Sequence, residues 1–137
     1  MIVVDTNIIA YLYLTSDHSV RAEQALLIDS HWVAPLLWRS EFRNGLAQYI
    51  RKNILSLEDA TRIMEEASEL MHSREYETTS PQVLKLAAES VCSAFDCEFI
   101  ALARDLNVPL VTLDKQLLNQ FPNDTISLDA FIKQTKE

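Results

Sequence analysis

The stretch Met1-Ile2-Val3-Val4-Asp5-Thr6-Asn7 decides the fold, because it joins an apolar, mostly β-branched run to a helical pattern over residues 8–13. An apolar run that ends in short polar residues is typical of a buried strand leading into a helix. Asp5 therefore lies at the carboxyl end of a strand, where open α/β sheets bind ligands. The alternative is that Asp5 or Thr6 only caps the helix, since both side chains can accept hydrogen bonds from first-turn amides.

Length and composition predict one domain spanning residues 1–137, because a chain of 137 residues that is 48% hydrophobic can form a substantial core. Asp5 interrupts the first apolar stretch and no basic region precedes it, so a signal peptide is not indicated. No later apolar run is long enough to cross a bilayer. We therefore expect a cytoplasmic protein that does not contact a membrane.

The formal net charge of −8 argues against a broad, non-specific nucleic-acid binder, because phosphate contacts need clustered lysine and arginine. RNA binding stays open if cations and a local basic strip offset this charge. The best basic candidates for phosphate contacts are Arg39, Arg43, Arg51, Lys52 and Lys115. Ordinary surface charge is the alternative explanation for each of them.

Several common site types are excluded by residue usage. Cys92 and Cys97 are the only cysteines, their spacing is not that of a redox pair, and no histidines cluster near them to bind zinc. We expect both thiols to pack as small apolar groups in a reducing compartment. Gly45 is the only glycine, so glycine-rich phosphate loops are impossible.

Strand patterns alternate with helix patterns, which predicts a three-layer α/β/α sandwich around a mostly parallel sheet. After the first strand, further strands are expected at 32–35, 75–78, 109–113 and 125–128. Helices are expected at about 20–27, 36–52, 56–71, 80–91, 93–106, 115–119 and from residue 129. The helices at 36–52 and 56–71 are joined by a short link, so they should form a protruding antiparallel hairpin.

Four acids belong to elements that can meet at one edge of this sheet. Asp5 and Asp114 follow strands, Asp96 lies in the first turn of a helix, and Glu41 lies beside the apolar stripe of another helix. Close carboxylates raise one another's pKa, so such a cluster persists only when cations hold it together. Hard oxygen ligands suit Mg²⁺ or Mn²⁺. The expected chemistry is phosphodiester hydrolysis, in which the metal activates water and neutralises phosphate charge.

Each acid also has a simpler explanation. Asp96 could serve only in a capping box with Ser93, and Asp114 could only cap the helix that follows it. Glu41 could be a boundary residue that reaches solvent. Glu98 is acidic and near the same region, and we interpret it as a solvated first-turn residue. Four independent caps nevertheless explain the joint pattern less well than one shared site.

PIN-domain nucleases carry four motifs that this sequence resembles in order and spacing. The motifs are Val3-Val4-Asp5-Thr6-Asn7-Ile8-Ile9, Ser40-Glu41-Phe42-Arg43-Asn44-Gly45-Leu46, Phe95-Asp96-Cys97-Glu98-Phe99-Ile100-Ala101-Leu102-Ala103 and Leu110-Val111-Thr112-Leu113-Asp114. They extend over nearly the whole chain. Within this family the likeness to the VapC toxins of bacterial toxin-antitoxin pairs is strongest.

This resemblance implies a PIN α/β/α sandwich whose four acids surround one or two Mg²⁺ or Mn²⁺ ions. The implied ligands and catalytic residues are Asp5, Glu41, Asp96 and Asp114. Supporting roles around these acids are implied for Thr6, Asn7, Asn44 and Thr112. The implied substrate is single-stranded RNA or the loops of tRNA or rRNA, and the implied partner is a cognate antitoxin. Together with the apolar stripe of the helix at 56–71, the resemblance also suggests a homodimer.

Three other functions compete with this interpretation. A phosphatase of the haloacid-dehalogenase type needs a second aspartate two residues after the first, and Asn7 occupies that place. A receiver-like module usually pairs acids after its first strand, where Asp5 stands alone. The third alternative is a PIN fold that binds RNA or protein, with nuclease activity that is silent or depends on a partner.

Overall fold

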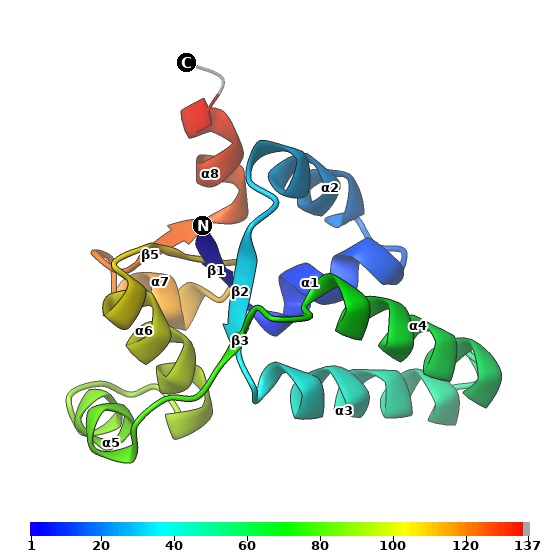
Figure 1. Cartoon of the computed structure of the whole chain (residues 1–137), viewed down its shortest axis with the longest axis horizontal. Helices are drawn as coiled ribbons and strands as arrows, with labels where there is room; N and C mark the ends of the chain where they lie inside the picture. The colour runs from blue at the N-terminus through cyan, green and yellow to red at the C-terminus, as the bar shows by residue number, and fades with distance from the viewer. Residues whose placement is uncertain (136–137) are drawn as a thin grey trace.

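Five short strands form one parallel sheet at the centre of the computed structural model, which describes residues 1–135 (Figure 1). The strands are β1 (Ile2–Val4), β2 (Trp32–Pro35), β3 (Glu75–Tyr76), β4 (Leu110–Thr112) and β5 (Thr125–Ser127). Their order across the sheet is β3-β2-β1-β4-β5, and every neighbouring pair is parallel. The prediction of a mostly parallel sheet is thus confirmed.

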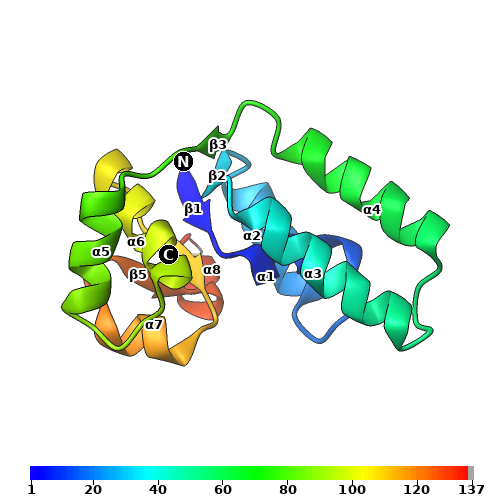
Figure 2. The same cartoon turned by 90° about the horizontal axis from the view of Figure 1, so that it is seen from below.

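Eight helices surround this sheet within residues 1–135. They are α1 (Thr6–Tyr13), α2 (Ser19–Ile28), α3 (Trp38–Arg51), α4 (Leu57–Leu70), α5 (Ser80–Ala88), α6 (Ala94–Leu106), α7 (Lys115–Gln120) and α8 (Leu128–Thr135). One face is covered by α6, with α5 outside it, and the other face by α1, α2 and α8 (Figure 2). The three-layer α/β/α prediction is confirmed. In the described part of the chain, no helix has both the length and the apolar character needed to cross a membrane.

The central strands are apolar on both sides, as expected for a parallel sheet covered by two layers of helices. Val3 and Val4 of β1 are completely buried, as are Leu110 and Val111 of β4. In the register of the sheet, Val3 lies beside both Val33 and Leu110. The chain runs from β1 outward to β2 and β3, whereas β4 and β5 lie on the other side of β1. The carboxyl ends of β1 and β4 therefore meet where the strand order reverses, which is the usual ligand position in such sheets.

The predicted helical hairpin is formed by α3 and α4, which extend from the body of the molecule in both views (Figures 1 and 2). Phe42 and Leu46 of α3 are buried, and so are Ala60 and Ile63 of α4. The hydroxyl of Ser56 accepts a hydrogen bond of 3.0 Å from the backbone amide of Asp59, as the capping pattern predicts. Leu57, at the tip, remains 72% exposed.

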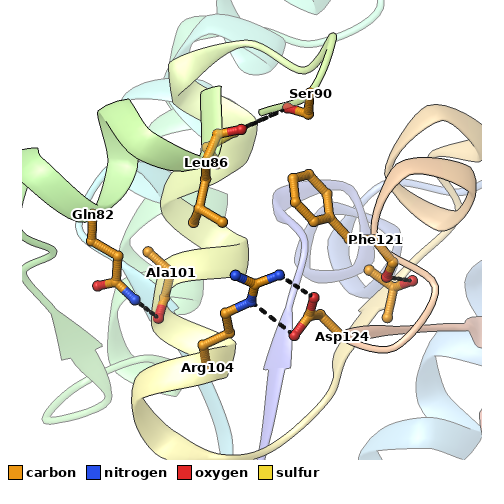
Figure 3. Close-up of polar contacts among 9 residues, drawn as sticks. Gln82, Leu86, Ser90, Ala101, Arg104, Phe121 and Asp124 are labelled. Atoms are coloured by element: carbon orange, nitrogen blue, oxygen red, sulfur yellow. Dashed lines mark hydrogen bonds and ion pairs between the residues drawn. The ribbon is translucent and has the colours of Figure 1, made fainter. Parts of the chain in front are cut away.

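Helix α6 is fixed at both flanks by polar contacts (Figure 3). The Arg104 guanidinium donates to both carboxylate oxygens of Asp124, at 3.1 and 3.0 Å, and lies over the ring of Phe121. On the other flank, Gln82 of α5 donates to the backbone oxygen of Ala101 at 3.5 Å. These contacts tie the second half of α6 to α5 and to the segment before β5.

The largest boundary difference from the sequence prediction is in α5, which ends at Ala88 instead of continuing to Val91. The hydroxyl of Ser90 donates to the backbone oxygen of Leu86 at 2.8 Å and accepts from the backbone amide of Cys92 at 3.2 Å. This side chain competes with helical backbone bonding and turns the chain toward α6. Val91 is consequently 69% exposed. Strand β3 is also shorter than predicted, at two residues.

Asn107 ends α6 in a left-handed conformation, with φ 54° and ψ 46°. Because a β-branched residue is strained there, Asn107→Val should lower the free energy of unfolding by about 1–2 kcal/mol. Asn107→Gly should keep or slightly raise it, because glycine adopts this conformation without strain. Urea denaturation followed by circular dichroism measures both, with Asn119→Val in α7 as the control. Equal destabilisation by valine and glycine would contradict this account.

Candidate active site

Asp5 lies at the carboxyl end of β1 and also caps α1. Its backbone amide donates to the carbonyl of Val111 at 3.1 Å, which holds it beside the end of β4. One carboxylate oxygen, Oδ1, accepts from the Thr6 amide at 2.8 Å, and the other, Oδ2, accepts from the Thr112 hydroxyl at 2.7 Å. The capping role and the sheet-edge position that the sequence left as alternatives therefore occur together in one side chain.

Thr112 connects Asp5 to Asp114. The Thr112 side chain is completely buried, and while its hydroxyl donates to Asp5 it accepts from the Asp114 backbone amide at 3.0 Å. The Asp114 carboxylate in turn caps α7 by accepting from the amides of Gln116 and Leu117. A single buried hydroxyl thus fixes the relative position of the acids that follow β1 and β4.

Glu41 reaches the same edge from α3. The hydroxyl of Thr6, a residue only 6% exposed, donates to Glu41 Oε1 at 2.7 Å. Glu41 is half-buried, as expected from its position beside the apolar stripe of α3. Thr6 therefore contributes its backbone amide to Asp5 and its hydroxyl to Glu41.

Asp96 occupies the first turn of α6. Its backbone amide donates to the Ser93 hydroxyl at 3.1 Å, which is the helix cap that the sequence predicted. The side chain of Asp96 is half-buried. Because an acid in the first turn of a helix faces the positive end of the helix dipole, this position favours an ionised carboxylate.

The four acids form one electrostatic cluster. Burial raises the pKa of Asp5 to about 6, the hydrogen bond from Thr112 partly offsets this, and the charges of Glu41 and Asp96 raise it further. Burial also raises the pKa of Glu41, with a smaller contribution from the charge of Asp96. The pKa of Asp96 is raised by burial and then by Asp114. Each carboxylate therefore acts on at least one other, as like charges at one edge must.

The chemistry of this cluster fits a hard divalent cation, because every donor is a carboxylate or hydroxyl oxygen. Suitable donor atoms do not by themselves make a formed coordination sphere. Within residues 1–135, no group of three or more aspartate, glutamate, histidine or cysteine side chains is arranged so that it could hold one metal ion. The carboxylates of Asp5 and Glu41 instead accept hydrogen bonds from Thr112 and Thr6. The fold therefore brings the four acids to one edge of the sheet, but their carboxylates do not surround a single ion position.

Within residues 1–135, none of the other side chains selected from the sequence forms a hydrogen bond or ion pair with these four carboxylates. Asn7 and Asn44 are exposed on α1 and α3. Arg39 and Arg43 are each two residues from Glu41, which places them about 200° around α3 from it. The guanidinium of Arg39 is paired with both carboxylate oxygens of Glu75, at 2.5 Å. Lys115 is exposed and directly follows Asp114.

Two carboxylates have contacts that the sequence analysis missed. Glu98 was interpreted as solvated, but it is half-buried and accepts from the Thr78 hydroxyl at 3.3 Å. Its charge also contributes to the raised pKa of Glu41. Glu75 accepts from the indole nitrogen of Trp38 at 2.7 Å as well as from Arg39. The partners are 20 or more residues apart, so no local pattern in the sequence could have indicated them.

The sequence matches the PIN domain family over residues 2–121. Ribonuclease VapC3 from Pyrobaculum aerophilum is 29% identical over 124 residues, which represent 88% of this chain and 95% of that protein.

Solved structures show the same fold. The crystal structure of PAE2754 from Pyrobaculum aerophilum superposes with a TM-score of 0.77 at 18% identity, covering 98% of this chain and 95% of that one. FitAcB from Neisseria gonorrhoeae gives a TM-score of 0.70 at 17% identity, covering 93% of this chain and 98% of that one. FitAB bound to the IR36 DNA fragment gives 0.68 at 18% identity, covering 93% and 95%. At these identities the likeness concerns the fold alone.

The raised pKa of Asp5 predicts a defined pH dependence of stability. Because the folded-state pKa is about 6 and the ordinary value is 3.8, the folded state binds the proton more tightly than the unfolded state. The metal-free protein should therefore lose stability as the pH rises from about 4 to about 6. At pH 8, Asp5→Asn should raise the free energy of unfolding by about 1–3 kcal/mol. Urea denaturation in EDTA measures this, and the exposed Asp105→Asn is the control. Lower stability of Asp5→Asn at pH 8 would contradict it.

The contact between Thr112 and Asp5 gives a second prediction. The hydrogen bond lowers the pKa of Asp5, so Thr112→Val should move that pKa above its present value of about 6. Thr112→Ser keeps the hydroxyl and should retain the wild-type value. The carboxyl carbon of Asp5, followed by NMR during a pH titration without metal, reports the shift. Thr125→Val is the matched control, because its hydroxyl donates to the backbone oxygen of Phe121 and not to any of the four acids. An equal shift in the valine and serine variants of Thr112 would contradict a role for the hydroxyl.

Proposed function

Because this chain belongs to the PIN-domain family, we propose that it is a metal-dependent endoribonuclease and the toxin of a toxin-antitoxin pair. The observation that carries this proposal is the cluster of four mutually interacting carboxylates at the carboxyl edge of the sheet. The ribonuclease activity is supported by the likeness to Ribonuclease VapC3 over most of both chains. The whole chain acts as a single PIN domain.

Mg²⁺ or Mn²⁺ would be held by Asp5, Glu41, Asp96 and Asp114, whose oxygens suit these ions. When bound, the ion supplies Lewis-acid activation of water and neutralises charge that develops on the phosphate. Burial and then mutual repulsion raise the pKa of Asp5 and Asp96, and a bound cation would offset the repulsion. The four acids are therefore the catalytic residues of the proposed nuclease.

The threonines position these acids before substrate arrives. Thr112 holds Asp5 through its hydroxyl and Asp114 through the backbone amide, and Thr6 holds both Asp5 and Glu41. Fixed hydrogen bonds of this kind reduce the reorganisation needed to bind a cation or a phosphate. Supporting roles for the exposed Asn7 and Asn44 are also proposed, through contacts made when substrate is bound.

The proposed substrate is single-stranded RNA or a loop in a tRNA or rRNA. Its phosphates would meet the open edge where the acids and their cations lie. Lys115 is the best placed of the basic residues for a phosphate contact, because it is exposed and adjacent to Asp114. Arg39 and Arg43 are weaker candidates, since they lie on the far side of α3 from Glu41 and Arg39 is already paired with Glu75.

The proposed partners are a cognate antitoxin and a second copy of this chain. The antitoxin follows from the resemblance to VapC toxins, and a basic or apolar arm would complement the acidic edge. The homodimer is supported by the apolar surface on the hairpin, where Ile54 and Leu57 are 61% and 72% exposed. The proposed location is the cytoplasm, where the free, buried Cys92 and Cys97 would stay reduced.

The nuclease proposal predicts cleavage that depends on both metal and the acids. The purified chain should cut end-labelled RNA in Mg²⁺ or Mn²⁺ and not in EDTA. Asp5→Asn and Asp96→Asn should each lower the cleavage rate at least about 100-fold, because each removes a charged oxygen ligand. Gel analysis of time courses measures the rates.

Asp105→Asn provides the matched control, since it makes the same chemical change on an exposed residue near the other end of α6. It should leave the cleavage rate within about twofold of wild type. Circular dichroism establishes that every variant is folded. Equal activity of Asp96→Asn and Asp105→Asn would contradict the proposal. RNA binding without cleavage of any RNA in a panel of tRNA, rRNA and single strands would favour the binding-module alternative.

A further inference from the structure

A hollow lies on the α5 side of α6. It is an open pocket of about 310 Å³ between the start of α5 and the start of α6. Its lining residues are Thr78, Ser80, Val83, Leu84, Ala94 and Glu98. The two helices lie side by side in both views, and the Gln82 to Ala101 hydrogen bond holds them together (Figure 3). The pocket is therefore bounded by elements whose relative position is fixed.

The walls of this pocket combine apolar and polar groups. Val83, Leu84 and Ala94 present aliphatic surface, and Leu84 is 64% exposed although it is a large hydrophobic residue. Thr78 and Ser80 contribute hydroxyls, and Glu98 contributes a carboxylate. A small planar group with polar atoms at its rim suits such a lining, because its faces meet the aliphatic surface and its rim meets the polar atoms.

Glu98 is the chemically decisive member of the lining. It is half-buried, and the Thr78 hydroxyl donates to its Oε1 at 3.3 Å, which fixes the direction of the carboxylate. In residues 1–135, no lysine, arginine or histidine forms an ion pair with Glu98. The charge of Glu98 contributes to the raised pKa of Glu41, so Glu98 lies within electrostatic range of that acid, although its position two residues after Asp96 places it on a different side of α6. A ligand in this pocket must therefore donate hydrogen bonds to an unpaired carboxylate.

We propose that this pocket binds a guanine base of the RNA substrate, with Glu98 accepting hydrogen bonds from its N1–H and N2–H groups. This inference rests on the proposed nuclease function. A phosphate is unsuitable there because its charge would be repelled by Glu98 and by the acid cluster. Guanine alone among the RNA bases has two adjacent N–H donors on its Watson–Crick edge, which match the two oxygens of a carboxylate. Unstacked bases in single-stranded RNA are recognised through such edges.

The neighbouring aromatic residue supports the same arrangement. Phe95 lies between Ala94 of the pocket and Asp96 of the acid cluster, and it is 62% exposed. An exposed aromatic ring beside a nuclease site offers a stacking surface to the next base, which is a common feature of single-strand binding. Glu98 would thus select one base, while Phe95 would add affinity without base preference.

Nucleoside binding tests the pocket independently of cleavage. NMR titration of the metal-free protein with guanosine should shift the amide signals of Thr78, Ser80 and Val83. Inosine lacks the 2-amino group and should bind about fivefold more weakly than guanosine. Adenosine should bind at least about tenfold more weakly than guanosine. Glu98→Gln should weaken guanosine binding about tenfold, because an amide offers only one acceptor oxygen to two donors. The exposed Glu89→Gln, at the end of α5, makes the same charge change and should bind guanosine like wild type.

RNA cleavage then connects the pocket to substrate choice. Oligonucleotides that differ by one guanine should show a lower KM for the guanine-containing strand, and Glu98→Gln should remove that difference. The exposed Glu89→Gln should retain the difference and leave kcat unchanged. Thr78→Val, which leaves Glu98 in place but without its hydroxyl partner, should reduce the guanine preference part of the way. This second variant also serves if Glu98→Gln is poorly folded. Guanosine binding by a wild-type protein that cuts no RNA would contradict the proposed nuclease function and still support the proposed guanine site.

Three results would overturn the guanine assignment. The first is RNA cleavage by wild type with no guanine preference and no change in KM in Glu98→Gln. The second is equal binding of guanosine and adenosine. The third is a loss of Mn²⁺ affinity in Glu98→Gln as large as that in Asp96→Asn, which would place Glu98 among the metal ligands instead.

Discussion

The placement of four like-charged carboxylates at one partly buried edge of the sheet is the constraint on which the rest of this structure depends. Asp5 and Asp114 are brought together because β1 and β4 are parallel neighbours at the point where the strand order reverses. Ionisation of Asp5 is opposed first by its burial and then by the charges of Glu41 and Asp96, and its pKa is raised to about 6. Thr112 lowers this pKa through its completely buried hydroxyl, which donates to the Asp5 carboxylate and accepts from the backbone amide of Asp114. The fold therefore holds an unfavourable charge cluster in place by hydrogen bonds that exist before any cation or substrate binds.

The same acidic side chains lie at helix starts and belong to the candidate active site. Asp5 caps α1, Asp114 caps α7, and Asp96 occupies the capped first turn of α6. Helix amides and dipoles at these positions favour ionised carboxylates, which partly counteracts the effect of burial and mutual repulsion. The alternative explanations of these acids as helix caps are thus correct in local geometry. They do not compete with the shared site, because three helix starts converge at one edge of the sheet.

Much of the fold follows from local sequence patterns, and the family predicted from the motifs is confirmed. The apolar runs of β1 and β4, the caps at Ser56 and Ser93, and the left-handed end at Asn107 all use interactions among residues close in the chain. The assignment of catalytic and metal roles to the four acids stays a prediction, although the structure gathers them. The contacts of Glu75 and Glu98 were beyond the sequence, because they join segments whose docking depends on the whole fold.

The charge distribution explains why base contacts suit the proposed nuclease better than a basic cleft. The net charge is −8, and several arginines are already neutralised by nearby acids. These pairs are Arg21–Asp129, Arg39–Glu75, Arg62–Asp59 and Arg104–Asp124. With these arginines paired and the net charge negative, we expect counterion release to contribute little affinity. Bound cations at the acid cluster and hydrogen bonds to an RNA base would then supply most of the affinity for RNA. A carboxylate such as Glu98 is useful in that setting, because it repels phosphate while accepting hydrogen bonds from a base.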